Sequence, residues 1–277
     1  VSGKTLSNLK WGNGVSTQGQ TALGNAKEKA DGLKNEANAK EFASEVAQYL
    51  TTAAGTSVAD GQDYSINNLA PGYYLVKDKD GSVVGQDSYT KFILKVVGTN
   101  VSAAVKSDVP TSQKKVMDTN DTTGETTGWQ DSADYDIGDK VPFQLTGTVA
   151  SDYNQYKSAY QLVFHDTLSA GLTFDESSVK VYVNDSKTPV ATNQYTITYP
   201  ATDGHSFDVT IHDVRALGEN VSKVRVEYEA ELNKNAVIGA VGNPNEMHME
   251  FSNNPNSTTG TEKGQTPTDK VIVFTYK

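Results

Sequence analysis

Alternation of apolar and polar residues dominates the second half of the chain. In residues 140–149 (KVPFQLTGTV) every second position from Val141 to Leu145 is apolar, and residues 223–232 (KVRVEYEAEL) repeat the pattern. Successive side chains of a strand point to opposite faces, so each segment has one face for a core. Several such short segments separated by turn residues are typical of a β-sandwich.

The first half of the chain mixes one helical pattern with strand patterns. From Asn35, the stretch NEANAKEFASEVAQYL places its apolar residues at helical spacing, which predicts one amphipathic helix. Residues 69–82 (LAPGYYLVKDKDGS) and 91–105 (KFILKVVGTNVSAAV) read as strands with turns. The polar segment KSDVPTS that follows contains a proline and is the natural linker. We therefore expect two domains, residues 1–108 and 109–277, with a mainly β fold and one helix inserted in the first domain.

The distribution of charge supports this boundary and limits the classes of binding partner to be expected. Residues 1–108 carry 11 lysines and 11 acidic residues, whereas the remainder carries 13 basic and 23 acidic residues, which accounts for the whole net charge of −10. An acidic chain of this kind is not expected to bind nucleic acid or an anionic membrane surface. No apolar run approaches the ~20 residues of a membrane span. The chain starts at Val1 without a signal peptide, and we expect it to be a fragment of a longer exported protein.

A histidine beside an aspartate, His165–Asp166, stands within an apolar run and could be a catalytic pair. Alternation along residues 160–168 (YQLVFHDTL) separates the two. Asp166 shares the more apolar face with Tyr160 and Phe164, so it is predicted to face the core, and His165 to face outward.

The same test predicts two more inward polar groups. One lysine of the pair Lys114–Lys115 faces the core, and the pattern favours Lys114. In NEMHMEFSNNPN, Asn253 falls on the apolar face, with Asn254 as the alternative. A buried unpaired charge is costly, so the lysine and Asp166 are expected to meet.

The sequence contains no motif that is typical of a conventional active site. The four histidines have no metal-binding spacing, no GxSxG elbow is present, and the chain has no cysteine. A hydrolase using His165 and Asp166 lacks a nucleophile. The sequence therefore predicts no enzyme in the usual sense, no cofactor and no metal site.

Four ordered motifs resemble the collagen-adhesin-like second domain of the backbone subunits of sortase-assembled Gram-positive pili. They are KKV (114–116), YDIGDKV (135–141), FHDTLSAGLTF (164–174) and EFSNNPN (250–256). The resemblance spans residues 109–277. Residues 1–108, with KWGNGV and LAPGYYLVKD, resemble the first domain of the same subunits without its opening strands. The resemblance of the whole chain implies two tandem immunoglobulin-like β-sandwich domains, with further domains following this fragment.

The resemblance also implies a self-formed isopeptide bond in the second domain. In the family, a lysine on the first strand is joined to an asparagine near the last, and an acid on a middle strand promotes the reaction. Matched motif to motif, these residues are Lys114 (or Lys115), Asn253 (or Asn254) and Asp166. Such a cross-link would take over the role of a disulfide in a cysteine-free extracellular protein.

The function implied is that of a structural shaft subunit of a cell-wall-anchored pilus. Its partners would be neighbouring pilin subunits, sortase during assembly and host surface molecules. The acceptor for sortase joining matches Lys106, in AVKSDVP. The alternative is a surface adhesin domain that binds host matrix protein or glycan, because related folds also do that.

Overall fold

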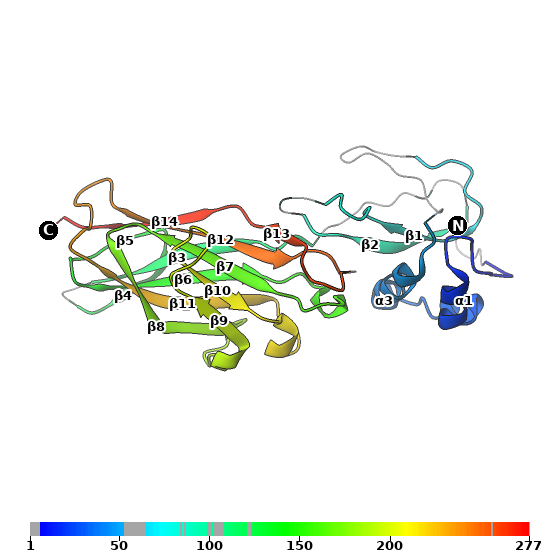
Figure 1. Cartoon of the computed structure of the whole chain (residues 1–277), viewed down its shortest axis with the longest axis horizontal. Helices are drawn as coiled ribbons and strands as arrows, with labels where there is room; N and C mark the ends of the chain where they lie inside the picture. The colour runs from blue at the N-terminus through cyan, green and yellow to red at the C-terminus, as the bar shows by residue number, and fades with distance from the viewer. Residues whose placement is uncertain are drawn as a thin grey trace. The chain divides into compact units, whose positions relative to one another are not determined.

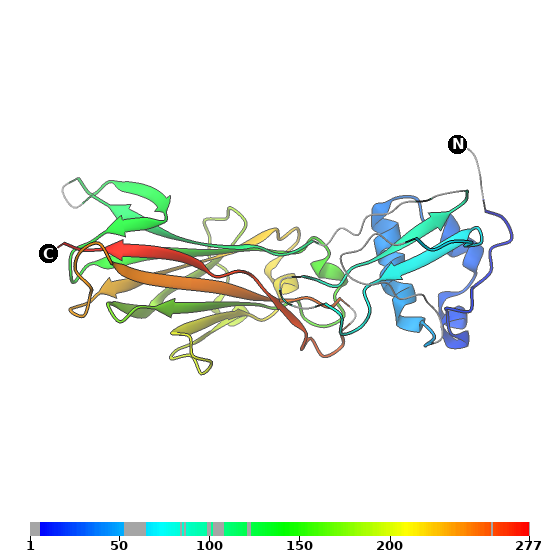
Figure 2. The same cartoon turned by 90° about the horizontal axis from the view of Figure 1, so that it is seen from above.

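The path of the chain is drawn in Figures 1 and 2. The computed structural model describes residues 6–52, 65–83, 85, 87–98, 101, 108–120, 123–255 and 257–276. These residues are mainly β, as the alternation predicts. The chain forms two compact units, of which the first comprises Val1–Val84 and Ser88–Ser107 and the second Gly85–Asp87 and Asp108–Lys277.

The first unit contains the predicted amphipathic helix, α3 (Glu36–Val46). Asn35 caps it, because its side chain accepts a hydrogen bond from the backbone N–H of Asn38 at 2.9 Å. The helix buries Ala43 and Val46. Cap and apolar spacing therefore agree, and the helix prediction is confirmed.

Two shorter helices precede α3, and the hydrophobic pattern did not predict them. They are α1 (Thr17–Leu23) and α2 (Ala26–Asp31), and the turn η1 (Ala47–Tyr49) follows α3. Strand β1 (Gly72–Lys77) pairs antiparallel with β2 (Lys91–Val96). Among the described residues of this unit these two strands form the sheet, so the sandwich expected for the first domain stays a prediction.

The second unit is a sandwich of two sheets. The first sheet has the order β4 (Thr126–Gln130), β3 (Ser112–Thr119), β6 (Lys140–Thr148), β11 (Lys223–Leu232) and β8 (Leu172–Val183). The second has the order β5 (Ser132–Asp134), β14 (Asp269–Phe274), β12 (Asn243–Ser252), β7 (Leu162–Leu168), β10 (Phe207–Ile211) and β9 (Tyr195–Thr198), with β13 (Lys263–Gln265) beside β12. Short turns η2 (Tyr153–Gln155), η3 (Thr192–Gln194) and η4 (Val214–Leu217) connect strands.

Alternation produces the core between these sheets. Buried and partly exposed residues alternate along β6 and along most of β11, with Phe143 and Tyr228 facing inward and stacked at 5.3 Å between ring centroids. Phe174 and Phe207 stack across the sandwich at 3.7 Å. Such aromatic pairs contribute roughly 0.5–1.5 kcal/mol each beyond the area they bury.

Strand β7 departs from the alternation because both of its faces are covered. It lies between β12 and β10, so that Asp166 is opposite Met247 and Phe207. Asp166 faces the core and is fully buried. His165 lies on the other face of the sheet, as predicted, but it is only 9% exposed and does not lie on an open surface.

Candidate functional site

Lys114 and Asp166 meet in the core as a fully buried pair, one contributed by each sheet. Lys114 Nζ donates a hydrogen bond to Asp166 Oδ2 and a second, at 3.1 Å, to the Tyr228 hydroxyl. The Tyr228 hydroxyl in turn donates to Asp166 Oδ2 at 3.0 Å. Nζ also lies 5.4 Å from the ring centroids of both Phe143 and Tyr228. The surroundings of this pair are therefore apolar and aromatic apart from the groups it bonds.

Asn245 on β12 is the third polar group of this cluster. It is fully buried, and its Nδ2 donates to the Tyr228 hydroxyl at 2.7 Å. Two acceptor oxygens in the cluster lack a donor, Asn245 Oδ1 and Asp166 Oδ1. A proton on Asp166 Oδ1 would make that atom a donor, which is the group the asparagine carbonyl lacks.

Burial shifts the protonation of the pair toward its neutral form. Desolvation lowers the pKa of Lys114 and raises the pKa of Asp166, against the attraction between the two groups. The pKa of Tyr228 lies well above its usual value, chiefly through burial, so the phenol keeps its proton. Burial thus favours a neutral amine and a neutral carboxylic acid in the buried cluster that also holds the Asn245 carboxamide.

The alternative lysine does not belong to this cluster. Lys115 points to the other face of β3, where it forms an ion pair with the exposed Asp131. Of the two lysines considered in the sequence analysis, Lys114 is the one that reaches Asp166.

The structure does not bring Asn253 or Asn254 to the pair. Met247 of β12 lies opposite Asp166, and Asn253 lies six positions farther along the chain (253 − 247), about 20 Å at 3.4 Å per residue. Asn254 instead donates to Glu262 at 3.3 Å. Asn253 does face inward, but at the wrong end of the strand, and Asn245 takes its place in the cluster.

A second buried asparagine of β12, Asn243, has a different role. Its Oδ1 accepts from the Val237 backbone N–H at 2.8 Å, and its Nδ2 donates to the backbone carbonyls of Val237 and Val273, both at 3.2 Å. Asn243 is thus fully hydrogen-bonded and ties a loop to the sheet. The unpartnered carbonyl and the contact with Tyr228 distinguish Asn245.

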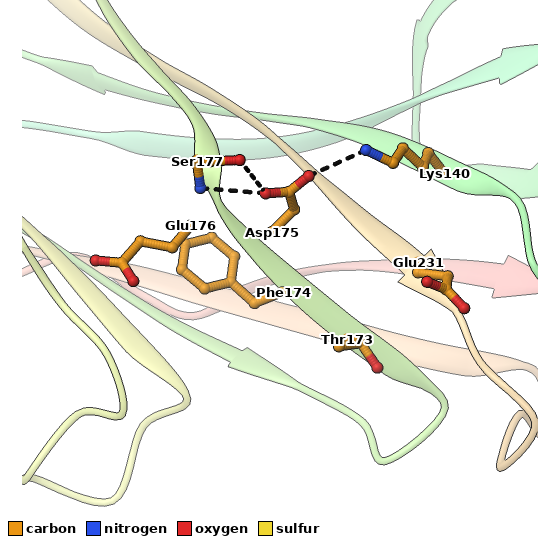
Figure 3. Close-up of a pocket in the computed structure, with 7 residues that line it drawn as sticks. All are labelled: Lys140, Thr173, Phe174, Asp175, Glu176, Ser177 and Glu231. Atoms are coloured by element: carbon orange, nitrogen blue, oxygen red, sulfur yellow. Dashed lines mark hydrogen bonds and ion pairs between the residues drawn. The ribbon is translucent and has the colours of Figure 1, made fainter.

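A shallow depression of about 600 Å³ lies on the surface along β8 (Figure 3). It is lined by Lys140, Thr173, Phe174, Asp175, Glu176, Ser177 and Glu231. Asp175 is held there by Lys140 at 3.1 Å and by Ser177, and Phe174 is mostly buried. The depression therefore lacks the exposed aromatic face on which a glycan would stack.

The predicted sortase acceptor, Lys106, lies outside the residues that the structure describes.

A β-sandwich domain whose sheets are bridged by a buried lysine, acid and asparagine is the class that the fold and site define. Residues 137–255 match the family model described as Gram-positive pilin backbone subunit 2, Cna-B-like domain. Over these residues the second domain is similar to the Gram-positive pilin backbone family.

Individual relatives agree with this family. The trypsin-resistant surface T6 protein of Streptococcus pyogenes serotype M6 is 26% identical over 240 residues, a match that covers 80% of this chain and 41% of that protein. This chain thus spans less than half the length of that relative. In the described part of the chain, no helix is long and apolar enough to cross a membrane.

Similar solved structures include three pilins. The major pilin BcpA of Bacillus cereus has a TM-score of 0.49 and 18% identity, with 74% of this chain and 55% of that chain covered. The T6 backbone pilin of S. pyogenes has a TM-score of 0.47 and 19% identity (75% and 47% covered). The major pilin SpaD of Corynebacterium diphtheriae has a TM-score of 0.47 and 21% identity (82% and 54% covered).

Proposed function

We propose that this chain is part of the shaft subunit of a covalently assembled Gram-positive pilus, and that Lys114 and Asn245 join in a self-formed isopeptide bond promoted by Asp166. The observation that carries the cross-link is the buried cluster in which Lys114, Asp166 and Asn245 all bond to the Tyr228 hydroxyl or to one another. The match of residues 137–255 to the pilin backbone family model supports the shaft role.

The reaction follows from the neutral forms of the groups. The Lys114 amine attacks Asn245 Cγ, while the protonated Asp166 donates a hydrogen bond to Asn245 Oδ1 and polarises the carbonyl. A new C–N bond forms, the bond from Cγ to Nδ2 breaks, and ammonia leaves. Asp166 takes the proton from the attacking amine and supplies one to the leaving group, so it ends the reaction protonated as it began.

Holding the reacting groups close together lowers the barrier further. Fixing the amine against the amide in a folded core is worth roughly 7–11 kcal/mol of barrier. Because the product is an amide held in the core, the reaction runs once per chain. The bond would connect β3 of one sheet to β12 of the other, and so tie the sandwich together across its core.

Intact-mass spectrometry tests the cross-link. The wild-type chain is expected to weigh about 17 Da less than its sequence mass, the mass of the ammonia lost in amide exchange. Asn245→Ala and Asp166→Ala should each show their full calculated mass, whereas Asn253→Ala should keep the ammonia loss. A wild-type chain of full mass, or a deficit that survives in Asn245→Ala, would contradict the assignment.

We also propose Lys106 as the acceptor through which sortase joins the next subunit. Its place immediately before the division of the two units, after residue 107, supports this role. In cells that express the cognate sortase, Lys106→Arg should abolish high-molecular-weight polymers, and Lys34→Arg, on an exposed lysine of the first unit, should not. Polymers that persist in Lys106→Arg would rule out this acceptor. That result would not bear on the proposed Lys114–Asn245 bond, which the mass measurement tests separately.

A further inference from the structure

Three of the four histidines gather on the outer face of the second sheet, although they are far apart in sequence. The His165 ring lies 4.7 Å from the His205 ring and 4.8 Å from the His248 ring, between centroids, and His205 and His248 are 5.0 Å apart. One ring nitrogen of each histidine lies within 4.8 Å of the corresponding nitrogens of the other two. The opposite face of this sheet carries Asp166 and faces Lys114 of the first sheet.

Strand register places the cluster on rigid backbone. His248 of β12 and Asp208 of β10 lie directly opposite His165 of β7, so the three form one row across adjacent strands. The three strands are labelled in Figure 1. His205 is the exception, since it comes from the loop between β9 and β10. That loop is anchored next to His205, where the Ser206 backbone N–H donates to the Asp166 carbonyl at 2.7 Å.

Two aspartates complete the cluster. His165 Nδ1 is hydrogen-bonded to Asp208 Oδ1 at 2.7 Å and lies 3.1 Å from Asp203 Oδ2. A carboxylate that accepts from one ring nitrogen leaves the other with a lone pair, and this carboxylate–histidine arrangement is typical of metal-ligating histidines.

His205 also lies against one of these aspartates. His205 Nδ1 is buried and makes no hydrogen bond of acceptable geometry, although Asp203 Oδ1 is 2.8 Å away. Asp203 therefore lies beside both His165 and His205.

We propose that His165, His205 and His248 form a binding site for a transition-metal cation of the Zn²⁺ type, with Asp208 orienting His165 and Asp203 available as a fourth ligand. Imidazole nitrogens with a carboxylate suit Zn²⁺ better than they suit the harder Ca²⁺ and Mg²⁺. The bound ion would fasten the loop of His205 to the sheet. The proposal is independent of the cross-link, which lies on the other face.

The geometry requires only a small adjustment. A tetrahedral ion with bonds of 2.0–2.1 Å holds its ligand atoms ~3.4 Å apart, so the imidazoles must approach one another by about an ångström. His205 and His248 are partly exposed and can rotate into place, whereas His165 is held by Asp208. Asp203, with 39% of its side chain exposed, leaves a path from solvent.

Zinc titration of the tag-free, metal-stripped chain tests the site. The wild type should bind one Zn²⁺ per chain at micromolar free zinc, measured by competition with a chromogenic chelator. Co²⁺ in its place should give the intense visible absorption of a tetrahedral complex. Asp208→Asn should weaken Zn²⁺ binding roughly 10–100-fold, the usual cost of removing a partner of a ligating histidine. His205→Ala and His248→Ala should weaken it further.

The fourth histidine provides the matched control. His212 is exposed and bonds to Thr196 at 2.6 Å, outside the cluster, so His212→Ala should leave zinc affinity unchanged. Thermal melts in chelator establish that each variant is folded. The proposal is overturned if the wild type binds no stoichiometric Zn²⁺, if His205→Ala and His248→Ala bind as tightly as the wild type, or if His212→Ala loses binding equally.

Discussion

Removing the proposed cross-link should lower the stability of the second domain by an amount set by the loop it closes. Lys114 and Asn245 are 131 residues apart (245 − 114), and the chain-entropy model for a covalent closure of that length predicts about 5 kcal/mol. Asn245→Ala should therefore lower the free energy of unfolding by about 5 kcal/mol.

Thermal unfolding followed by circular dichroism or calorimetry measures this loss. For a domain of this size each kcal/mol shifts Tm by about 2–4 °C, so the cross-link alone accounts for about 10–20 °C. Urea titration gives the difference in unfolding free energy directly, provided that the slope is analysed for each variant, because a cross-link also makes the unfolded chain more compact.

Asn253→Ala is the control for this experiment. Its side chain is buried just after the same strand and its Oδ1 is also unpartnered, so the truncation is chemically the same without touching the cluster. It should cost no more than about 1–2 kcal/mol. Equal losses in Asn245→Ala and Asn253→Ala would refute the assignment of Asn245. If the wild type shows the ammonia loss but Asn245→Ala lowers the free energy of unfolding by less than about 2 kcal/mol, the entropic argument is refuted.

Two further predictions concern the chemistry of the cluster. Tyr228→Phe removes the hydroxyl that joins Lys114, Asp166 and Asn245, so cross-linking after refolding from urea should slow without being abolished, as followed by the time course of intact mass. For pH, the neutral pair and the ion pair of Lys114 and Asp166 hold the same single proton, so their ratio does not depend on pH. Since burial lowers the pKa of Lys114 and raises that of Asp166, strong acid adds a second proton that charges the amine, and strong alkali removes the proton that the acid must donate. Cross-linking should therefore be constant from mildly acidic to mildly alkaline pH and fall at both extremes, and a sloping profile across neutral pH would contradict the neutral-pair mechanism.

Period-2 alternation was enough to predict the second domain, because most of its strands have one covered and one open face. It also oriented Lys114 and Asp166 correctly. The short helices α1 and α2 escaped prediction because they bury little: α1 buries Gly19 and Leu23, and α2 buries nothing. Their ends are set by the caps Ser16 and Asn25, a local hydrogen-bond signal that hydrophobic spacing does not contain.

The choice of asparagine failed for a different reason. The alternation that places Met247, Met249 and Asn253 on the inner face of β12 places Asn245 there as well, so the face was predictable. Which of the two asparagines lies beside Asp166 depends on the register between β7 and β12, which sequence patterns do not encode. The loop after the strand drew attention to Asn253, whereas the pairing of Met247 with Asp166 selects Asn245.

The histidine cluster was invisible to motif analysis because its members are 40 and 43 residues apart (205 − 165 and 248 − 205). Metal motifs with short spacings report ligands on one helix or loop. Here each ligand comes from a different segment, and only the pairing of β7 with its two neighbours aligns them. The outward orientation predicted for His165 is what places it beside the other two histidines.

The two proposed sites share β7 and β12 but should act independently. Asn245 and His248 are three positions apart on β12, about 10 Å along the strand, and their side chains point to opposite faces. Perturbations separated by more than 7–10 Å without shared partners usually add within about 0.5 kcal/mol, which is about a twofold change in affinity. Asn245→Ala, although destabilised, should therefore bind Zn²⁺ within about twofold of the wild-type affinity at a temperature where both are folded. The ladder that aligns His165 with His248 is made by backbone hydrogen bonds, which the cross-link does not form. A tenfold loss of zinc affinity in Asn245→Ala would show that the metal site depends on the covalent tie, and that the sheet by itself does not hold the histidines in place.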